Sequence, residues 1–131
     1  MPMAYNKAME NLFLPQTIVE TRPYQRAVDL IWDEQTQIDF KNYIGLYPMQ
    51  GDIIPGTGGV RKIRWQGTGH GKRGGVRVIY YLYDDNHPIY LLYAYPKNAK
   101  LNLSEAEKKA FKEATEEIKR TFREKEERSH G

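Results

Sequence analysis

The chain of 131 residues has no cysteine, so disulfide bonds are excluded and the composition fits a reducing compartment. Serine is almost as scarce, since only Ser104 and Ser129 occur, at an expected helix start and in the tail. Neither position favours a nucleophilic hydrolase. The histidines His70, His87 and His130 are scattered without the spacing of metal ligands, so we expect no metal site.

Long apolar runs are also lacking, and no stretch approaches the length needed to span a bilayer. The first residues, MPMAYNKAMENLFLPQT, have neither a basic start nor an apolar core and so do not match a secretory signal. We therefore expect a cytoplasmic protein without membrane contact.

Hydrophobic residues make up 40% of the chain and charged residues 28%, which favours a globular protein over a disordered one. A chain of this length supports one modest core. We expect residues 1–16 to be an N-terminal extension and residues 17–131 to form a single domain.

Acidic residues are absent between Asp52 and Asp84. This stretch holds six cations, although the whole chain has a net charge of only +3, so the remaining residues are net acidic. Such a concentration of positive charge is typical of a protein that binds a polyanion, and a solvated basic surface is the alternative. The six cations are Arg61, Lys62, Arg64, Lys72, Arg73 and Arg77.

A glycine-rich segment, GTGHGKRGGVR at 67–77, lies inside this basic stretch. Residues 69–74 match G-x-G-x-x-G, but a strand rather than a helix follows, which argues against a dinucleotide site. A P-loop is excluded because Gln66 and Arg73 stand where that motif needs glycine and Ser or Thr. Glycines in a basic loop allow an anionic partner to approach the backbone closely.

The order of expected elements is β, α, α, β, β, β, α, which predicts an α+β fold. Pro23 suits a helix start, and Ser104 with Glu107 has the pattern of a capping box at the start of a terminal helix. Nothing apolar follows Phe122, so we expect the tail to fray. The elements are expected at 17–21 (strand), from about 23 to 32 and from 34 to 46 (helices), at 60–65 (strand), at 76–95 (hairpin) and from 104 (helix).

Alternation in the strand VRKIRW, 60–65, places Lys62 and Arg64 on one face and Arg61 on the other, with Ile63 and Trp65. Clustered cations of this kind need neither a metal nor a cofactor to act on RNA. They can stabilise the dianionic phosphate that forms when a 2′-hydroxyl attacks the neighbouring phosphodiester.

Three motifs together carry a resemblance: GDIIPGTGGVRKIRWQGTGHGKRGGVRVIYY at 51–81, IYLLYAYPKN at 89–98 and the S-x-x-E helix start. Over roughly 17–122 the chain closely resembles HigB-type toxins of the RelE/ParE superfamily, from type II toxin–antitoxin systems. The resemblance implies a RelE-like fold, a small antiparallel sheet with two N-terminal helices and a C-terminal helix. It also implies a ribosome-dependent mRNA endonuclease that cuts in the A site.

The same resemblance assigns site residues. It implies catalytic roles for Lys62, Arg64, Arg77 and Lys97, and RNA or ribosome contacts for Arg61, His70, Lys72 and Arg73. This chain departs from the family pattern at His70, where relatives carry lysine, and at Pro96 and Ala99. The superfamily's C-terminal catalytic tyrosine has no obvious counterpart, which leaves the general base open.

The partners implied are a helix-turn-helix antitoxin similar to HigA, mRNA and the ribosomal A site, with operator DNA contacted only through the antitoxin. The antitoxin either covers Arg64 and Arg77 directly or docks on apolar surface offered by Tyr24, Trp32 and the terminal helix, and we favour the second mode. Two alternatives stay open at this point: a non-catalytic RNA- or DNA-binding module, and an inactive toxin homologue retained for antitoxin binding.

Overall fold

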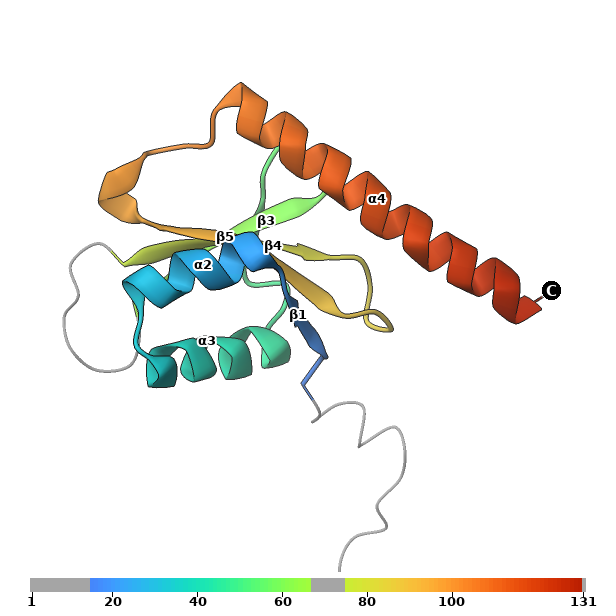
Figure 1. The fold of residues 1–131 in the computed structure, drawn as a ribbon, viewed down its shortest axis with the longest axis horizontal. Helices are drawn as coiled ribbons and strands as arrows, with labels where there is room; N and C mark the ends of the chain where they lie inside the picture. Colours follow the sequence, from blue (N-terminus) through green and yellow to red (C-terminus); the bar gives the residue numbers. More distant parts are fainter. Residues whose placement is uncertain (1–14, 67–74, 131) are drawn as a thin grey trace, which may run out of the picture.

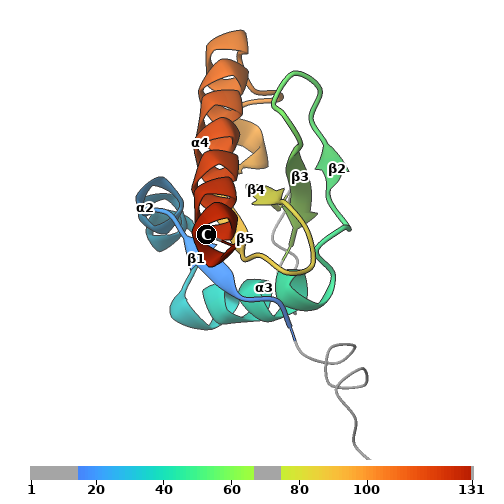
Figure 2. The same ribbon diagram turned by 90° about the vertical axis from the view of Figure 1, so that its right-hand side faces the viewer.

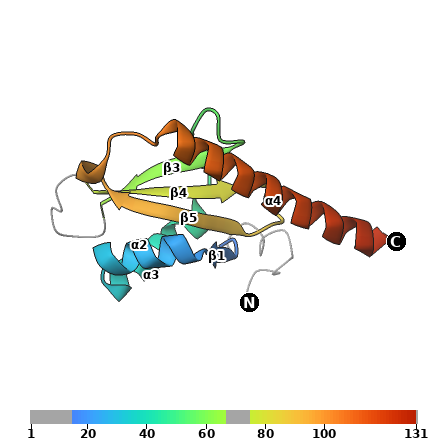
Figure 3. The same cartoon turned by 45° about the horizontal axis from the view of Figure 1, so that its top comes forward.

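A mixed sheet lies between two helical layers in the computed structural model, which describes residues 15–66 and 75–130 (Figure 1). One face of the sheet carries two short helices, and the single long helix α4 crosses the other face (Figures 2 and 3). The elements are β1 (Ile18–Glu20), α2 (Arg22–Ile31), α3 (Glu34–Leu46), β2 (Asp52–Ile53), β3 (Val60–Trp65), β4 (Val76–Leu82), β5 (Ile89–Pro96), the 3-10 turn η1 (Lys97–Ala99) and α4 (Glu105–His130). The α+β class is confirmed.

The strand order is β1-β5-β4-β3-β2, with antiparallel pairing from β5 to β2. The expected antiparallel arrangement holds for these four strands, and at one edge β1 adds a parallel pairing with β5. Backbone hydrogen bonds from Ile89 N to Thr17 O (2.8 Å) and from Thr21 N to Leu91 O (3.1 Å) hold this edge. The partners are about 70 residues apart, so no local pattern specifies their relative direction.

Alternation along β4 divides the core into two clusters. Val78 and Tyr80 pack in the cluster beneath α2 and α3, whereas Ile79 and Tyr81 pack in the cluster beneath α4. A register shift against β5 occurs between Ile79 and Tyr80, where Leu92 is the extra residue of a bulge. In both clusters, the side chains that the sheet contributes are the ones that strand alternation assigns to that face.

Helix starts follow the sequence signals. The Thr21 side chain caps α2 by accepting from Tyr24 N (3.4 Å), and Pro23 occupies its first turn. Asp33 caps α3 by accepting from Thr36 N (2.8 Å), and the bounds of α3 agree with the prediction from sequence. The predicted capping box at α4 also forms between Ser104 and Glu107.

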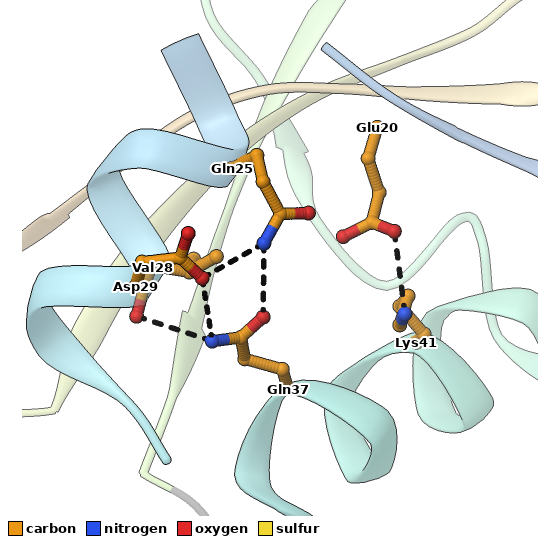
Figure 4. Close-up of polar contacts among 6 residues, drawn as sticks. All are labelled: Glu20, Gln25, Val28, Asp29, Gln37 and Lys41. Carbon is orange, nitrogen blue, oxygen red and sulfur yellow. Dashed lines mark hydrogen bonds and ion pairs between the residues drawn. The ribbon is translucent and has the colours of Figure 1, made fainter. Parts of the chain in front are cut away.

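A polar network joins α2 to α3 (Figure 4). The Gln25 amide donates to Asp29 (2.8 Å) and to Gln37 (3.3 Å), and Gln37 donates to Asp29 (3.2 Å). Lys41 of α3 forms an ion pair with Glu20 at the end of β1 (3.3 Å). A hollow of about 480 Å³ lies over this network, lined by Gln25, Asp29, Glu34, Gln37, Ile38 and Lys41.

Strand β2 falls within a segment that the sequence predicts as loop. Two side chains from the sheet, Tyr80 and Arg61, bind the turn that precedes β2. The Tyr80 hydroxyl donates to Pro48 O (2.7 Å) and accepts from Gly51 N (2.9 Å). A Cβ at Gly51 would lie only 2.6 Å from that hydroxyl, so glycine is required for this close approach.

Helix α4 continues to His130, which corrects the expectation that the tail frays after Phe122. Its last turns project beyond the sheet (Figure 1). Residues 123–128, REKEER, are strong helix formers with opposite charges four positions apart, which supports a helix without a packed face. No helix in the described ranges is long and apolar enough to cross a membrane.

The apolar surface expected for antitoxin docking is also wrong in part. Tyr24 and Trp32 are 0% and 5% exposed, because both belong to the core between α2, α3 and the sheet. Among the described residues, the large exposed apolar side chains lie elsewhere, at Leu30, Ile38, Leu46, Tyr47, Met49, Ile53, Tyr83 and Leu101. The division into a 1–16 extension and one domain stays a prediction, since residues 1–14 lie outside the described ranges.

Candidate functional site

One end of the sheet face beneath α4 is open. Along β3, exposure on this face rises from buried Val60 through half-buried Lys62 to exposed Arg64. Along β4, it rises from buried Tyr81 to half-buried Arg77. Helix α4 covers the Val60–Tyr81 end, where Thr115 packs against the β2–β3 loop, and leaves the other end accessible.

Arg64 and Arg77 lie directly opposite each other across β3 and β4. Arg77 is in turn the direct partner of Tyr95 on β5. Adjacent strands are about 5 Å apart, so this row spans about 10 Å across three strands. The two arginine side chains therefore project from the same face of the sheet, on neighbouring strands.

Gln66 and Gly75, which flank residues 67–74 in the chain, shape the surroundings of Arg64. With the side-chain amide of Gln66 in the orientation that satisfies hydrogen bonding at both its O and its N, the amide oxygen accepts from Arg64 Nη2 (2.5 Å) and Nε (3.3 Å). Gly75 has φ +64°, and a Cβ there would lie 3.0 Å from Trp65 O. Glycine at 75 thus allows the chain to enter β4 close beside the end of β3.

Lys62 and Lys97 flank the arginine pair. Lys62 lies two residues before Arg64 on the same face, opposite Asp52 on β2. Lys97 begins η1, is exposed, and donates its backbone N–H to Gly75 O (3.2 Å). The structure therefore brings all four residues expected to be catalytic toward one end of the sheet, whereas their roles stay a prediction.

Arg61 is not part of this group. It lies on the face toward α2 and α3, where its guanidinium donates to Gly51 O (2.7 Å) and Met49 O (3.4 Å). These bonds fasten the turn before β2 to the sheet. The other expected RNA or ribosome contacts, His70, Lys72 and Arg73, lie outside the described residues.

Two residues beside the site were missed from sequence. The Tyr95 side chain is 2% exposed, and within the described ranges its buried hydroxyl has no hydrogen-bond partner. Burial raises the pKa of Tyr95, although the charges of Lys100 and Arg77 act in the opposite direction. Lys100 extends over the Tyr95 ring and forms an ion pair with Glu107. Its contacts come from β5 and α4, so no local sequence signal distinguished it.

His87 lies in the β4–β5 turn, away from the arginine pair. Its Nδ1 lies 2.6 Å from Asp84, and its ring packs on Phe122 with centroids 4.1 Å apart. The turn is thereby attached to α4. Over residues 15–66 and 75–130, no group of three or more His, Asp or Glu side chains is placed to hold a metal ion.

The open end of the sheet can hold an anion by charge. Arginine stays protonated at all physiological pH values, so Arg64 and Arg77 supply fixed positive charge rather than proton transfer. Fixed donors on a rigid sheet are suited to stabilising negative charge that develops on a phosphate.

The fold and the charge together define a class of small α+β protein, in which helices cover both faces of the sheet and cations gather at one end of it. Residues 50–128, more than half of the chain, match the family described as the RelE toxin of the RelE/RelB toxin–antitoxin system. The chain therefore belongs to the RelE toxin family. It is a toxin of a toxin–antitoxin system, and its partner in that system is an antitoxin.

Proposed function

We propose that this toxin is a ribosome-dependent endoribonuclease of the HigB type, which cuts mRNA in the A site without a metal ion. The observation that carries the proposal is the pair Arg64 and Arg77, which face each other on the exposed end of the sheet. Lys62 and Lys97 complete a cationic face around the scissile phosphate.

In the proposed reaction, the 2′-oxygen of one nucleotide bonds to the adjacent phosphorus and the bond from phosphorus to the 5′-oxygen breaks. The 2′-hydroxyl loses its proton, and the departing 5′-oxygen gains one. The products are a 2′,3′-cyclic phosphate and a 5′-hydroxyl. Arg64 and Arg77 stabilise the pentacoordinate phosphate, which carries more negative charge than the starting diester.

The surrounding charge supports RNA as the substrate. No acidic residue occurs between Asp52 and Asp84, so the strands that carry the site add only positive charge. Lys72 and Arg73 of the adjoining loop are proposed to hold RNA or ribosome phosphates, and His70 belongs to the same contact surface. For Arg61 we propose a structural role in place of the expected RNA contact, because its guanidinium already donates to two backbone carbonyls.

The proposed antitoxin is a helix-turn-helix protein similar to HigA, through which operator DNA is contacted. The toxin acts in the cytoplasm, where translating ribosomes are found. Masking of a cationic face by acidic antitoxin residues would oppose RNA binding directly.

The deciding experiment adds purified toxin to translating ribosomes and maps new mRNA ends. Cleavage that leaves a 2′,3′-cyclic phosphate, and that a 2′-deoxy substitution at the cut nucleotide abolishes, supports the proposal. Retention on ribosomes without cleavage supports a non-catalytic binding module. Failure both to cleave and to arrest growth, with antitoxin binding intact, supports an inactive homologue.

A further inference from the structure

Lys100 lies beside the proposed catalytic face, although it was not among the expected site residues. It follows η1, in the segment that connects the end of β5 to α4 (Figure 1). Its ammonium lies 5.4 Å from the centroid of the Tyr95 ring and 5.8 Å from that of Tyr93. Both distances are within cation–π range.

This position extends the arginine row by one step. Tyr95 is the cross-strand partner of Arg77, and Lys100 sits over the ring of Tyr95. The charges of Lys100 and Arg77 both act to lower the pKa of Tyr95, against the larger effect of burial. Positive charge thus runs across β3, β4 and β5 and onto the following segment.

Lys100 is held in place yet reaches solvent. Glu107 forms an ion pair with the ammonium, and Glu107 is itself fixed by accepting from Ser104 N (2.8 Å). The Lys100 and Glu107 side chains are 30% and 33% exposed. A lysine oriented by an ion pair and two rings loses less conformational entropy on binding an anion than a fully mobile one.

We propose that Lys100 binds a phosphodiester of the mRNA strand next to the scissile phosphate, with Glu107 as the positioning residue. The inference rests on the proposed function, because it takes Arg64 and Arg77 as the place where the scissile phosphate lies. Lys100 then directs the strand across the sheet from β3 toward the start of α4.

The test asks whether Lys100 and one particular phosphate of the mRNA depend on each other in binding. Ribosomes are programmed with an mRNA whose attacking nucleotide is 2′-O-methylated, which prevents cleavage, and toxin affinity is measured. A neutral methylphosphonate then replaces each phosphate flanking the scissile one in turn. At one of these positions it should weaken wild-type binding about tenfold, the effect of losing one charged contact, and should weaken Lys100→Gln no further.

Two matched variants control the result. Lys108 also forms an ion pair with a glutamate, Glu105 at 3.4 Å, so Lys108→Gln should keep the full methylphosphonate effect. Lys100→Arg should restore most of the affinity that Lys100→Gln loses. An affinity loss in Lys100→Gln that is equal for normal and methylphosphonate mRNA would assign Lys100 to ribosomal RNA and overturn the proposal.

Glu107→Gln tests the positioning role, because glutamine can still complete the capping box. Removing the carboxylate should change affinity in the Lys100 protein and have a different effect in the Lys100→Gln background. Equal effects in both backgrounds would remove Glu107 from the proposal.

Failure of this inference and failure of the proposed function are distinguishable. If wild type cleaves unmodified mRNA but Lys100→Gln responds to every methylphosphonate as wild type does, only Lys100 is wrongly assigned. If wild type binds without cleaving, the proposed function fails. The comparison of methylphosphonate effects in wild type and Lys100→Gln then still decides for or against Lys100. Absence of wild-type binding to the programmed ribosomes would overturn both.

Discussion

Arg64 and Arg77 lie directly opposite each other on neighbouring strands of the toxin. Like charges in this arrangement oppose folding by up to about 1 kcal/mol. A sheet that keeps two arginines face to face at its open end gains nothing in stability from the pairing. An anion bound between them would reverse the sign of the interaction, as the proposed function expects.

Replacing Arg64 by alanine should leave the protein folded and abolish its activity. Arg64 is exposed, so the free energy of unfolding should change by no more than about 0.5 kcal/mol. Cleavage of mRNA on translating ribosomes should fall at least tenfold, because a contact to transition-state charge is lost. Urea denaturation and mapping of mRNA ends measure the two effects.

Arg120→Ala is the matched control for Arg64. Arg120 is an exposed arginine of α4 paired with Glu117 at 2.7 Å, so its loss should alter neither quantity appreciably. A folded Arg64→Ala variant with wild-type cleavage would remove Arg64 from the site.

Arg61→Ala should affect stability rather than RNA binding. The half-buried guanidinium holds the carbonyls of Gly51 and Met49, and loss of charged hydrogen bonds should lower the free energy of unfolding by about 1–2 kcal/mol. Affinity for programmed ribosomes, measured where the variant is fully folded, should match wild type. Weaker binding without lost stability would instead support the role in RNA contact that the sequence suggested for Arg61.

Two buried tyrosines should respond in opposite ways to loss of their hydroxyls. Tyr80→Phe leaves Pro48 O and Gly51 N without their partner and should cost about 1–3 kcal/mol of unfolding free energy. Tyr95→Phe removes a buried hydroxyl that has no partner in the described part of the chain, so it should be neutral or stabilising. Equal losses in thermal or urea denaturation would contradict the hydrogen bonding described for Tyr80.

The ion pair between Lys100 and Glu107 should make stability depend on pH in acid. The hydrogen bond from Lys100, followed by that from Ser104 N, lowers the pKa of Glu107, so the stabilisation is present above the ordinary glutamate pKa. It is lost as pH falls through the lowered pKa in the folded state. The stability advantage of wild type over Glu107→Gln should therefore be constant near neutrality and shrink below about pH 5. Urea denaturation of both proteins from pH 3 to 7 measures this. A stability advantage at pH 3 as large as the one at pH 7 would count against the pair.

Local signals in the sequence were sufficient for most of the elements, though not for β2 or the end of α4, and for part of the site. The capping box at Ser104 and the alternation of 60–65 depend on neighbours within a few residues, so they can be read from the chain. The alternation correctly separated Lys62 and Arg64 from Arg61. It could not show that Arg61 would meet carbonyls of the turn before β2, because those atoms belong to another element.

By itself, the sequence determined the α+β class, the basic stretch and the family, since each depends on residue type and spacing along the chain. The tertiary structure alone decided that β1 joins β5 in parallel, that Arg64 faces Arg77, and that Lys100 is held by Glu107 over Tyr95. These relationships join residues from separate elements, and strand register and helix docking set their distances. Tertiary packing, rather than any local preference of the chain, therefore sets which of the cations lie near one another.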